Sequence, residues 1–75
     1  MHTHAMIKRV LWALGEENRL LHASDLGLND QDYTQLLETM RQTELITDTS
    51  ASAKLAPNGE YIYKLSRIAG MNRLV

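Results

Sequence analysis

Apolar residues recur at positions i, i+3, i+4 and i+7, the spacing of an amphipathic helix, in three segments of the 75-residue chain. The first of these segments predicts a helix over residues 3–16, which Gly15 or the region of Asn18 ends. The face that we expect this helix to bury comprises Ile7, Val10, Leu11 and Leu14.

The second segment has the best defined start. Asn29 is a good N-cap residue, and Asp30 and Asp32 occupy the first turn, where the helix dipole favours acidic side chains. The spacing predicts a helix over residues 30–43. Its expected buried face comprises Tyr33, Leu36, Leu37 and Met40.

The third segment begins at Pro57, a residue suited to the first turn of a helix. Its apolar spacing predicts a helix over residues 57–69 and leaves residues 70–75 as a tail. The face that we expect it to bury comprises Tyr61, Ile62, Leu65, Ile68 and Ala69.

Between the second and third helices the pattern changes from helical spacing to that of a β-hairpin. Residues 45–47 are aliphatic or β-branched, residues 50–52 are small and polar, and Leu55 follows on the far side. Earlier in the chain, a short extended piece at residues 20–21 precedes a helix of about one turn, which Ser24 and Asp25 cap and Gly27 stops.

This order of elements predicts an α+β fold, a winged helix-turn-helix with a three-helix core, a β-hairpin wing and a C-terminal helix. We expect it to fill residues 1–75 as a single domain, because the chain has no linker, repeat or low-complexity run. A domain of this size buries only about 60% of the surface that its unfolded chain exposes, so its stability is marginal.

Residues 25–46 and residues 54–65 form two runs that resemble the YjcQ-like family of small bacterial and prophage winged-helix proteins. The first, DLGLNDQDYTQLLETMRQTELI (residues 25–46), combines an Asp-aliphatic-Gly-aliphatic turn, a capping residue, an aromatic residue and Leu and Met at core spacing. The second, KLAPNGEYIYKL (residues 54–65), is similar to the start of the last helix in that family, with Ala56 in place of the usual Thr and Ile62 in place of Tyr. The resemblance implies the fold more firmly than a function, and DNA binding follows from fold precedent.

Composition and charge bear on three classes of protein: nucleic-acid-binding, disulfide- or metal-stabilised, and secreted or membrane proteins. The formal net charge of −1 provides no basic field that would steer the chain onto nucleic acid. The chain has no Cys, which excludes disulfides and thiolate metal sites. It also lacks a signal peptide and a run of roughly 18 apolar residues that could span a membrane, so we expect a cytoplasmic protein.

In a helix-turn-helix protein that binds double-stranded DNA, the exposed face of the recognition helix enters the major groove. On residues 30–43, Gln31, Thr34 and Gln35 are the candidates for reading base edges, and Arg41 and Lys54 are the candidates for phosphate contact. The same part of the chain carries four acids against the one base Arg41, a formal charge of −3, which opposes phosphate binding. They are Asp30, Asp32, Glu38 and Glu44. The open alternative is a solvated helix face whose acids complement the helix dipole.

The sequence contains no convincing catalytic or metal-binding motif. The tetrad HASD at residues 22–25 has the residue types of a hydrolase triad, but consecutive residues do not converge as a triad must. His2 and His4 have no acidic or Cys partner nearby in the sequence that would complete a metal site. We therefore expect neither an enzyme nor a cofactor, and no small-molecule substrate.

Trp12 lies about 150° from the centre of the apolar face of the first helix, at 100° per residue, and we expect it to be at least partly exposed. Tyr63 is similarly off the apolar face of the last helix. Together with apolar residues of the tail, these side chains indicate an interface and a homodimer. The candidate interface residues are Trp12, Tyr63, Met71 and Leu74. The open alternative is that the tail or Tyr63 of the same chain covers Trp12.

Two functions therefore remain open from the sequence. The first is a small bacterial or phage-type DNA-binding protein, a transcriptional regulator. The second is a protein-interaction or dimerisation module that does not bind DNA.

Overall fold

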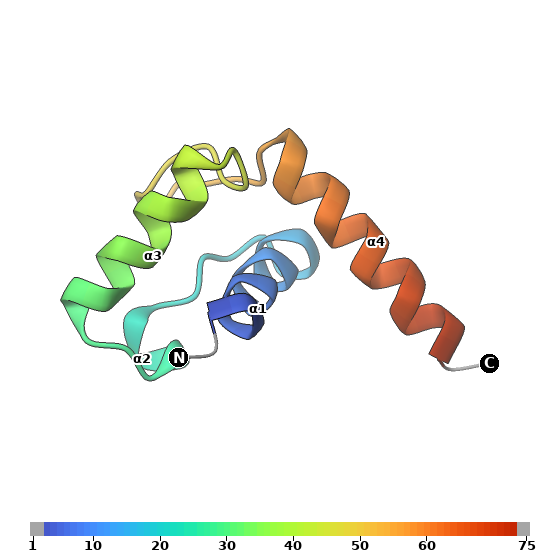
Figure 1. Cartoon of the computed structure of the whole chain (residues 1–75), viewed down its shortest axis with the longest axis horizontal. Coiled ribbons are helices and arrows are strands. Elements are labelled where there is room, and N and C mark those ends of the chain that lie inside the picture. The colour runs from blue at the N-terminus through green and yellow to red at the C-terminus, as the bar shows by residue number, and fades with distance from the viewer. Residues whose placement is uncertain (1–2, 74–75) are drawn as a thin grey trace.

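The computed structural model of the chain describes residues 3–73, with the side chains of residues 4–69, and contains four helices in that range. They are α1 (Thr3–Glu16), α2 (Ala23–Leu26), α3 (Asp30–Gln42) and α4 (Pro57–Arg73). Helix α1 lies in the centre of the molecule and contacts both α3 and α4, which diverge from each other on its two sides (Figure 1). The predicted helices are confirmed, although α4 continues four residues beyond its predicted end at Ala69.

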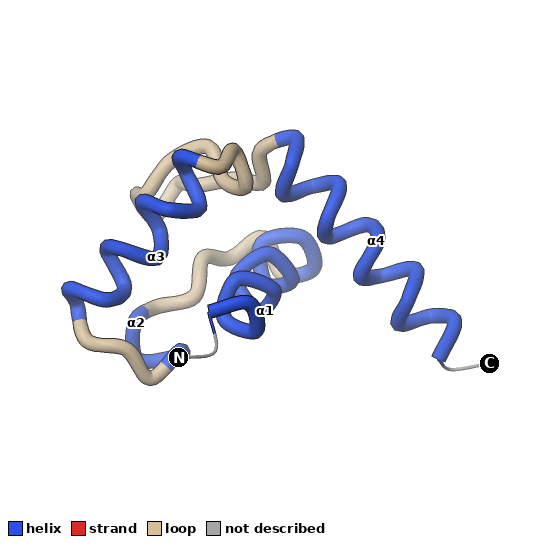
Figure 2. Tube along the Cα trace, viewed as in Figure 1, coloured by secondary structure: helices blue, strands red, loops and turns tan. Residues whose placement is uncertain are grey.

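The predicted α+β winged helix is wrong, because the fold is all-helical and residues 3–73 contain no sheet (Figure 2). The predicted hairpin region holds a single antiparallel bridge, between Ile46 and Leu55. Two backbone bonds form it, from the N–H of Thr47 to the carbonyl oxygen of Lys54 at 2.9 Å and from the N–H of Ala56 to the carbonyl oxygen of Leu45 at 3.1 Å. The rest of the segment between α3 and α4 is loop, so the molecule has no β-hairpin wing.

Side-chain hydrogen bonds explain why the ladder stops after one bridge. The carboxylate of Asp48 accepts from the backbone N–H of Thr49 at 2.6 Å and of Ser50 at 3.2 Å. The carbonyl oxygen of Ser50 in turn accepts from the N–H of Ala53 at 3.0 Å. Asp and Ser side chains that bond nearby backbone groups compete with ladder formation. The loop therefore meets its hydrogen-bonding needs locally instead of across two strands.

The predicted extended piece at residues 20–21 forms no strand either. The carbonyl oxygen of Leu21 accepts a hydrogen bond of 2.6 Å from the hydroxyl of Tyr33 on α3. Burial, and secondarily the negative charge of Asp25, raise the pKa of Tyr33 above its ordinary value. A side chain thus anchors this segment where a winged helix would have a paired strand.

Local capping fixes the ends of α2 and the start of α3. Helix α2 has His22 at the N-cap instead of the predicted Ser24 and Asp25, and the carboxylate of Asp25 accepts from the backbone N–H of His22 at 2.8 Å. Gly27 ends α2 with φ of 69°, a left-handed conformation that glycine adopts without a Cβ penalty. Asn29 caps α3 as predicted, because its side chain accepts from the N–H of Asp32 at 2.7 Å.

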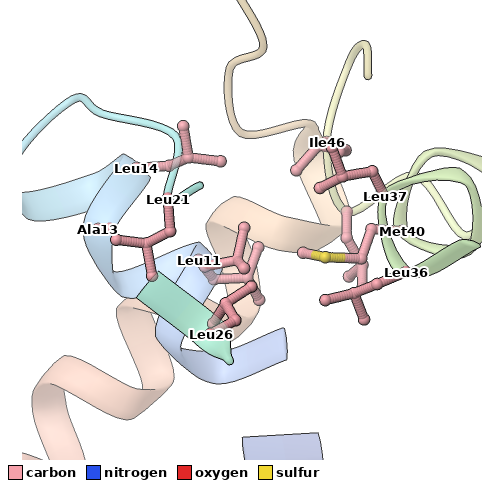
Figure 3. Packing of buried hydrophobic residues seen from close by; sticks show 11 residues of the cluster. Leu11, Ala13, Leu14, Leu21, Leu26, Leu36, Leu37, Met40 and Ile46 are labelled. Atoms are coloured by element: carbon pink, nitrogen blue, oxygen red, sulfur yellow. The ribbon is translucent and has the colours of Figure 1, made fainter. Parts of the chain in front are cut away.

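The core lies between α1, α2 and α3 and is almost entirely aliphatic (Figure 3). Its largest fully buried side chains are Leu11, Met40, Ile46 and Val10. The predicted inner face of α3 is confirmed, since Leu36, Leu37 and Met40 are buried and Tyr33 is partly buried. No polar or charged residue is buried among the residues whose side chains are described, so the interior of this core is held by apolar packing.

Candidate interaction surface on helices α1 and α4

Two glycines let α4 approach the rest of the chain closely. A Cβ at Gly59 would overlap the backbone carbonyl oxygen of Leu45, and a Cβ at Gly15 would lie 2.5 Å from the ring of Tyr63. The first turn of α4 therefore packs against the loop after α3, and the ring of Tyr63 packs directly on the backbone of α1. These contacts fix the side of α4 that faces α1.

Tyr63 is part of this internal packing. Its side chain is 8% exposed, and its ring meets that of Trp12 edge-on, with centroids 5.6 Å apart and an interplanar angle of 61°. Its hydroxyl donates a hydrogen bond to the carboxylate of Glu16, which, together with burial, raises the pKa of Tyr63. The prediction that Tyr63 is an exposed interface residue is therefore wrong.

Trp12 itself is 42% exposed, as the sequence predicted for this residue. The alternative that Tyr63 of the same chain covers Trp12 holds in part, because the two rings are in contact and Trp12 still stays partly exposed. Met71 lies in α4, although its side chain is not described, and Leu74 lies outside the described residues.

The outer face of α4 carries three large apolar side chains that the sequence pattern predicted to be buried. Tyr61 is 65% exposed, Leu65 49% and Ile68 56%. We call these three residues the α4 stripe. At 100° per residue, Leu65 lies about 160° around the helix from Tyr63, so the stripe points away from α1. The predicted buried face holds in part for Ile62, which packs against the core, and is wrong for the stripe and Ala69, because the glycine contacts and Tyr63 turn the opposite side of α4 inward.

A pocket of about 610 Å³ lies between α1, the segment that follows it and α4. We call it the α1–α4 pocket. Its apolar lining comprises Trp12, Ala13, Leu21 and Ala69. Its charged lining comprises Lys8, Arg9, Arg19 and Glu17. Three cations and one carboxylate give this lining a formal charge of +2, opposite in sign to the net charge of −1 of the whole chain.

The residues predicted to read DNA bases share one exposed face of α3. Gln31, Thr34 and Gln35 are all exposed, and they lie at positions i, i+3 and i+4 of the helix. Arg41 lies ten residues beyond Gln31, about 15 Å along the helix axis. The structure therefore places the three polar candidates together and the candidate phosphate contact of α3 at its opposite end.

Both cations predicted to contact phosphate have intramolecular partners. The guanidinium of Arg41 forms an ion pair with Glu38 one turn earlier, a contact that lowers the pKa of Glu38 and raises that of Arg41. The ammonium of Lys54 donates to the side-chain oxygen of Asn18 at 3.1 Å. Lys54 thus lies in the loop beside the end of α1, at a position where no wing exists to carry it toward DNA.

Among residues 3–73, no group of three or more His, Asp and Glu side chains is arranged to hold a metal ion. His4 is exposed on α1, whereas His2 lies outside the described residues. Over the same range, no helix combines the length and the hydropathy that a bilayer-spanning segment requires.

No protein-family model, no curated protein and no solved structure matches this chain. The resemblance to the YjcQ-like family, which rests on residues 25–46 and 54–65, therefore stays a prediction.

Sequence reasoning identified Trp12 but missed the α4 stripe and the pocket. The spacing of four and then three residues from Tyr61 to Leu65 to Ile68 is that of a coiled-coil seam as well as that of a buried helix face. Gly59, four residues before Tyr63, was the available signal for orientation, since a glycine inside a helix often marks a close approach of backbone.

Proposed function

We propose that this chain is a helical protein-interaction module that forms a homodimer through the α4 stripe. The observation that carries the proposal is the exposure of Tyr61, Leu65 and Ile68 on one face of α4. Contiguous exposed apolar side chains favour association with another apolar surface, because association removes them from water. The sequence-based expectation of a cytoplasmic location belongs to the same proposal.

The spacing of the stripe supports a second copy of the chain as the partner. Tyr61, Leu65 and Ile68 occupy successive d, a and d positions of a heptad, the positions that interlock when two helices pair. A two-fold axis near Leu65, the middle residue, brings each stripe against its own counterpart, so one surface serves both partners. A domain this small also gains from association, because its own core buries a limited share of its surface.

The flanks of the stripe are compatible with close pairing. Lys64 and Glu60, the charged residues beside it, form an ion pair within the helix at 3.0 Å. Neither charge therefore needs a partner from another chain. The stripe spans seven residues, about 10 Å of helix, so the interface is small and we expect dissociation in the micromolar range.

Size-exclusion chromatography with light scattering tests the proposal. Over about 10 to 500 µM, the mass should rise from that of one chain to that of two, and Leu65→Glu should abolish the rise because it places a charge in the seam. Gln35→Glu, which adds the same charge on the exposed face of α3, is the matched control and should dimerise like the wild type. A wild-type chain that stays monomeric throughout, or a control that dissociates equally, would contradict the proposal.

Double-stranded DNA binding is the second candidate function. The exposed polar face of α3 formed by Gln31, Thr34 and Gln35 supports it, since Gln and Thr side chains pair with base edges. The ion pair with Glu38 compensates the charge of Arg41, whereas the hydrogen bond of Lys54 to the neutral side chain of Asn18 leaves its charge in place, so few cations near that face are available for phosphates. Any binding should therefore depend weakly on salt.

A titration with random-sequence duplex, followed by amide chemical shifts, separates the two candidates. DNA binding predicts shifts between Gln31 and Lys54 at about 50 mM salt, and a slope of log affinity against log salt of about −2 to −4. Replacing both Asp30 and Asp32 by Asn should tighten DNA binding, because it removes negative charge near the phosphates. If no amide in that range moves, the DNA hypothesis should be abandoned and the interaction module retained.

A further inference from the structure

The α1–α4 pocket has the dimensions of a small-molecule site. Its volume of about 610 Å³ falls within the range of about 300–1,000 Å³ in which ligand pockets occur. Its lining combines apolar residues with a few charged groups. Ligand sites commonly have this composition, in which apolar surface holds the ligand and charged groups fix its orientation. The pocket is distinct from the α4 stripe, because none of the three stripe residues lines it.

Helix α1 places two positively charged side chains beside Trp12, part of the apolar lining of the pocket. Lys8 precedes Trp12 by four residues and Arg9 precedes it by three, so all three side chains occupy neighbouring positions on one side of the helix. The partly exposed Trp12 provides apolar surface, and Lys8 and Arg9 line the same pocket.

Not all of the positive charge is neutralised within the chain. Arg19 lies 3.7 Å from the carboxylate of Glu17 and 3.6 Å from that of Asp25, so its charge is compensated. Arg9 donates to the backbone carbonyl oxygen of Asp25 at 2.9 Å, a bond that orients the guanidinium without cancelling its charge. Within the described part of the chain, no carboxylate lies within 4.0 Å of Lys8 or Arg9.

We infer that the α1–α4 pocket binds an amphipathic organic anion, with its apolar body against Trp12 and its single anionic head beside Lys8 and Arg9. The apolar lining favours a ligand whose apolar body gains free energy by leaving water. The uncompensated cations Lys8 and Arg9 favour a negative head group over a neutral or positive one. This inference does not rest on dimerisation through α4.

The emission of Trp12, the only tryptophan of the chain, reports on the pocket directly. Octanoate, octan-1-ol and octylammonium share one apolar body and differ in head charge. We expect octanoate to shift the emission of Trp12 to the blue saturably, and to bind about tenfold more tightly than octylammonium. Hexanoate should bind more weakly, by up to about fourfold for each CH₂ that the longer chain buries.

Two variants separate the anion site from a general apolar surface. Lys8→Gln should weaken octanoate binding about threefold, the size expected for an exposed ion pair, and should leave octan-1-ol unchanged. Lys64→Gln removes the same charge from the opposite side of α4, where Lys64 pairs with Glu60, and is the matched control. Adding Arg9→Gln to Lys8→Gln should weaken octanoate further.

The measurements are repeated in Leu65→Glu, which disrupts the proposed dimer and leaves every residue of the pocket lining intact. Octanoate binding that persists in this background supports the anion site whatever the outcome for dimerisation. Three results would overturn the inference: no shift of Trp12 emission with millimolar octanoate, equal affinity for octylammonium, or equal losses in Lys8→Gln and Lys64→Gln.

Discussion

Two glycine residues set the distance between α4 and the rest of the chain. At both positions the place of a Cβ is already occupied, at Gly15 by the ring of Tyr63 and at Gly59 by the backbone of Leu45. The two obstacles differ, because a ring can rotate or shift whereas a backbone carbonyl in a packed loop moves only with its neighbours. The orientation of α4, and with it the exposure of its stripe, therefore depends most on Gly59.

We expect Gly59→Ala to lower the free energy of unfolding by about 1–3 kcal/mol, the cost of overpacking, although Ala is the better helix former. Urea denaturation followed by circular dichroism measures this change. Gly27→Ala is the control: no atom lies within 4 Å of its Cβ, so only the left-handed backbone, with φ of 69°, should cost stability, about 1–2 kcal/mol. If Gly59→Ala stabilises the protein, α4 does not pack as closely on the backbone of Leu45 as described.

The hydrogen bond from Tyr63 to Glu16 predicts how stability depends on alkaline pH. The pKa of Tyr63 is raised in the folded chain, so the folded state holds its proton more tightly than the unfolded state. This contribution is complete below the unfolded pKa of about 10 and is lost as pH rises through the higher folded value. Stability should therefore fall as pH rises above about 10.

Tyr63→Phe should flatten this fall, because the variant has no phenol at position 63 to ionise. Tyr33, whose pKa is also raised, accounts for part of the remaining slope. Tyr61→Phe removes the same hydroxyl from an exposed ring and should behave like the wild type. Denaturation curves from pH 9 to 12 that are identical for wild type and Tyr63→Phe would contradict the role assigned to this hydrogen bond.

At the scale of single elements, α3 depends on its N-cap. Asn29→Ala removes the bond to the N–H of Asp32 and should cost about 1 kcal/mol of unfolding free energy. Gln31→Ala, in the same turn but exposed and outside the cap, should change stability by less than about 0.5 kcal/mol. Thermal denaturation of the two variants measures the difference, and equal losses would show that the cap does not hold this end of α3.

The bounds of α1 and α3 could be predicted from the sequence because they depend on local signals. The apolar spacing from Ile7 to Leu14, and the cap at Asn29, act within one helix and need no knowledge of its neighbours. The hairpin could not be predicted correctly, because its pattern of aliphatic and polar residues does not reveal that Asp48 satisfies the turn from within. The local hydrogen bonds of Asp48 therefore make the segment between α3 and α4 a loop instead of a β-ladder.

The buried face of α4 illustrates a second limit of sequence reasoning. Tyr61, Leu65 and Ile68 form the larger apolar face, yet Tyr63 and Gly59 face inward. Periodicity identifies an apolar face but not what covers it. The candidate site was therefore predictable at Trp12, which lies off a well defined core face, and not at the α4 stripe, where the apolar residues were assigned to the core.

At the scale of the whole molecule, the positively charged pocket, the acidic side chains and the exposed apolar stripe lie on different surfaces. The α1–α4 pocket carries a formal charge of +2, whereas the acids Asp30, Asp32 and Glu38 lie on α3, on the other side of α1 (Figure 1). The outer face of α4 is apolar. This distribution suits one surface for self-association and a separate one for an anion better than it suits a continuous positive surface for DNA.

Isotope-filtered NOE spectroscopy on a mixture of labelled and unlabelled chains tests self-association through α4 most directly, because it identifies the residues that meet across the interface. At a concentration where light scattering gives twice the chain mass, the methyl groups of Leu65 and Ile68 should show intermolecular contacts with the α4 stripe of the other copy. A chain that remains monomeric near 1 mM, or intermolecular contacts confined to α3, would contradict this assignment.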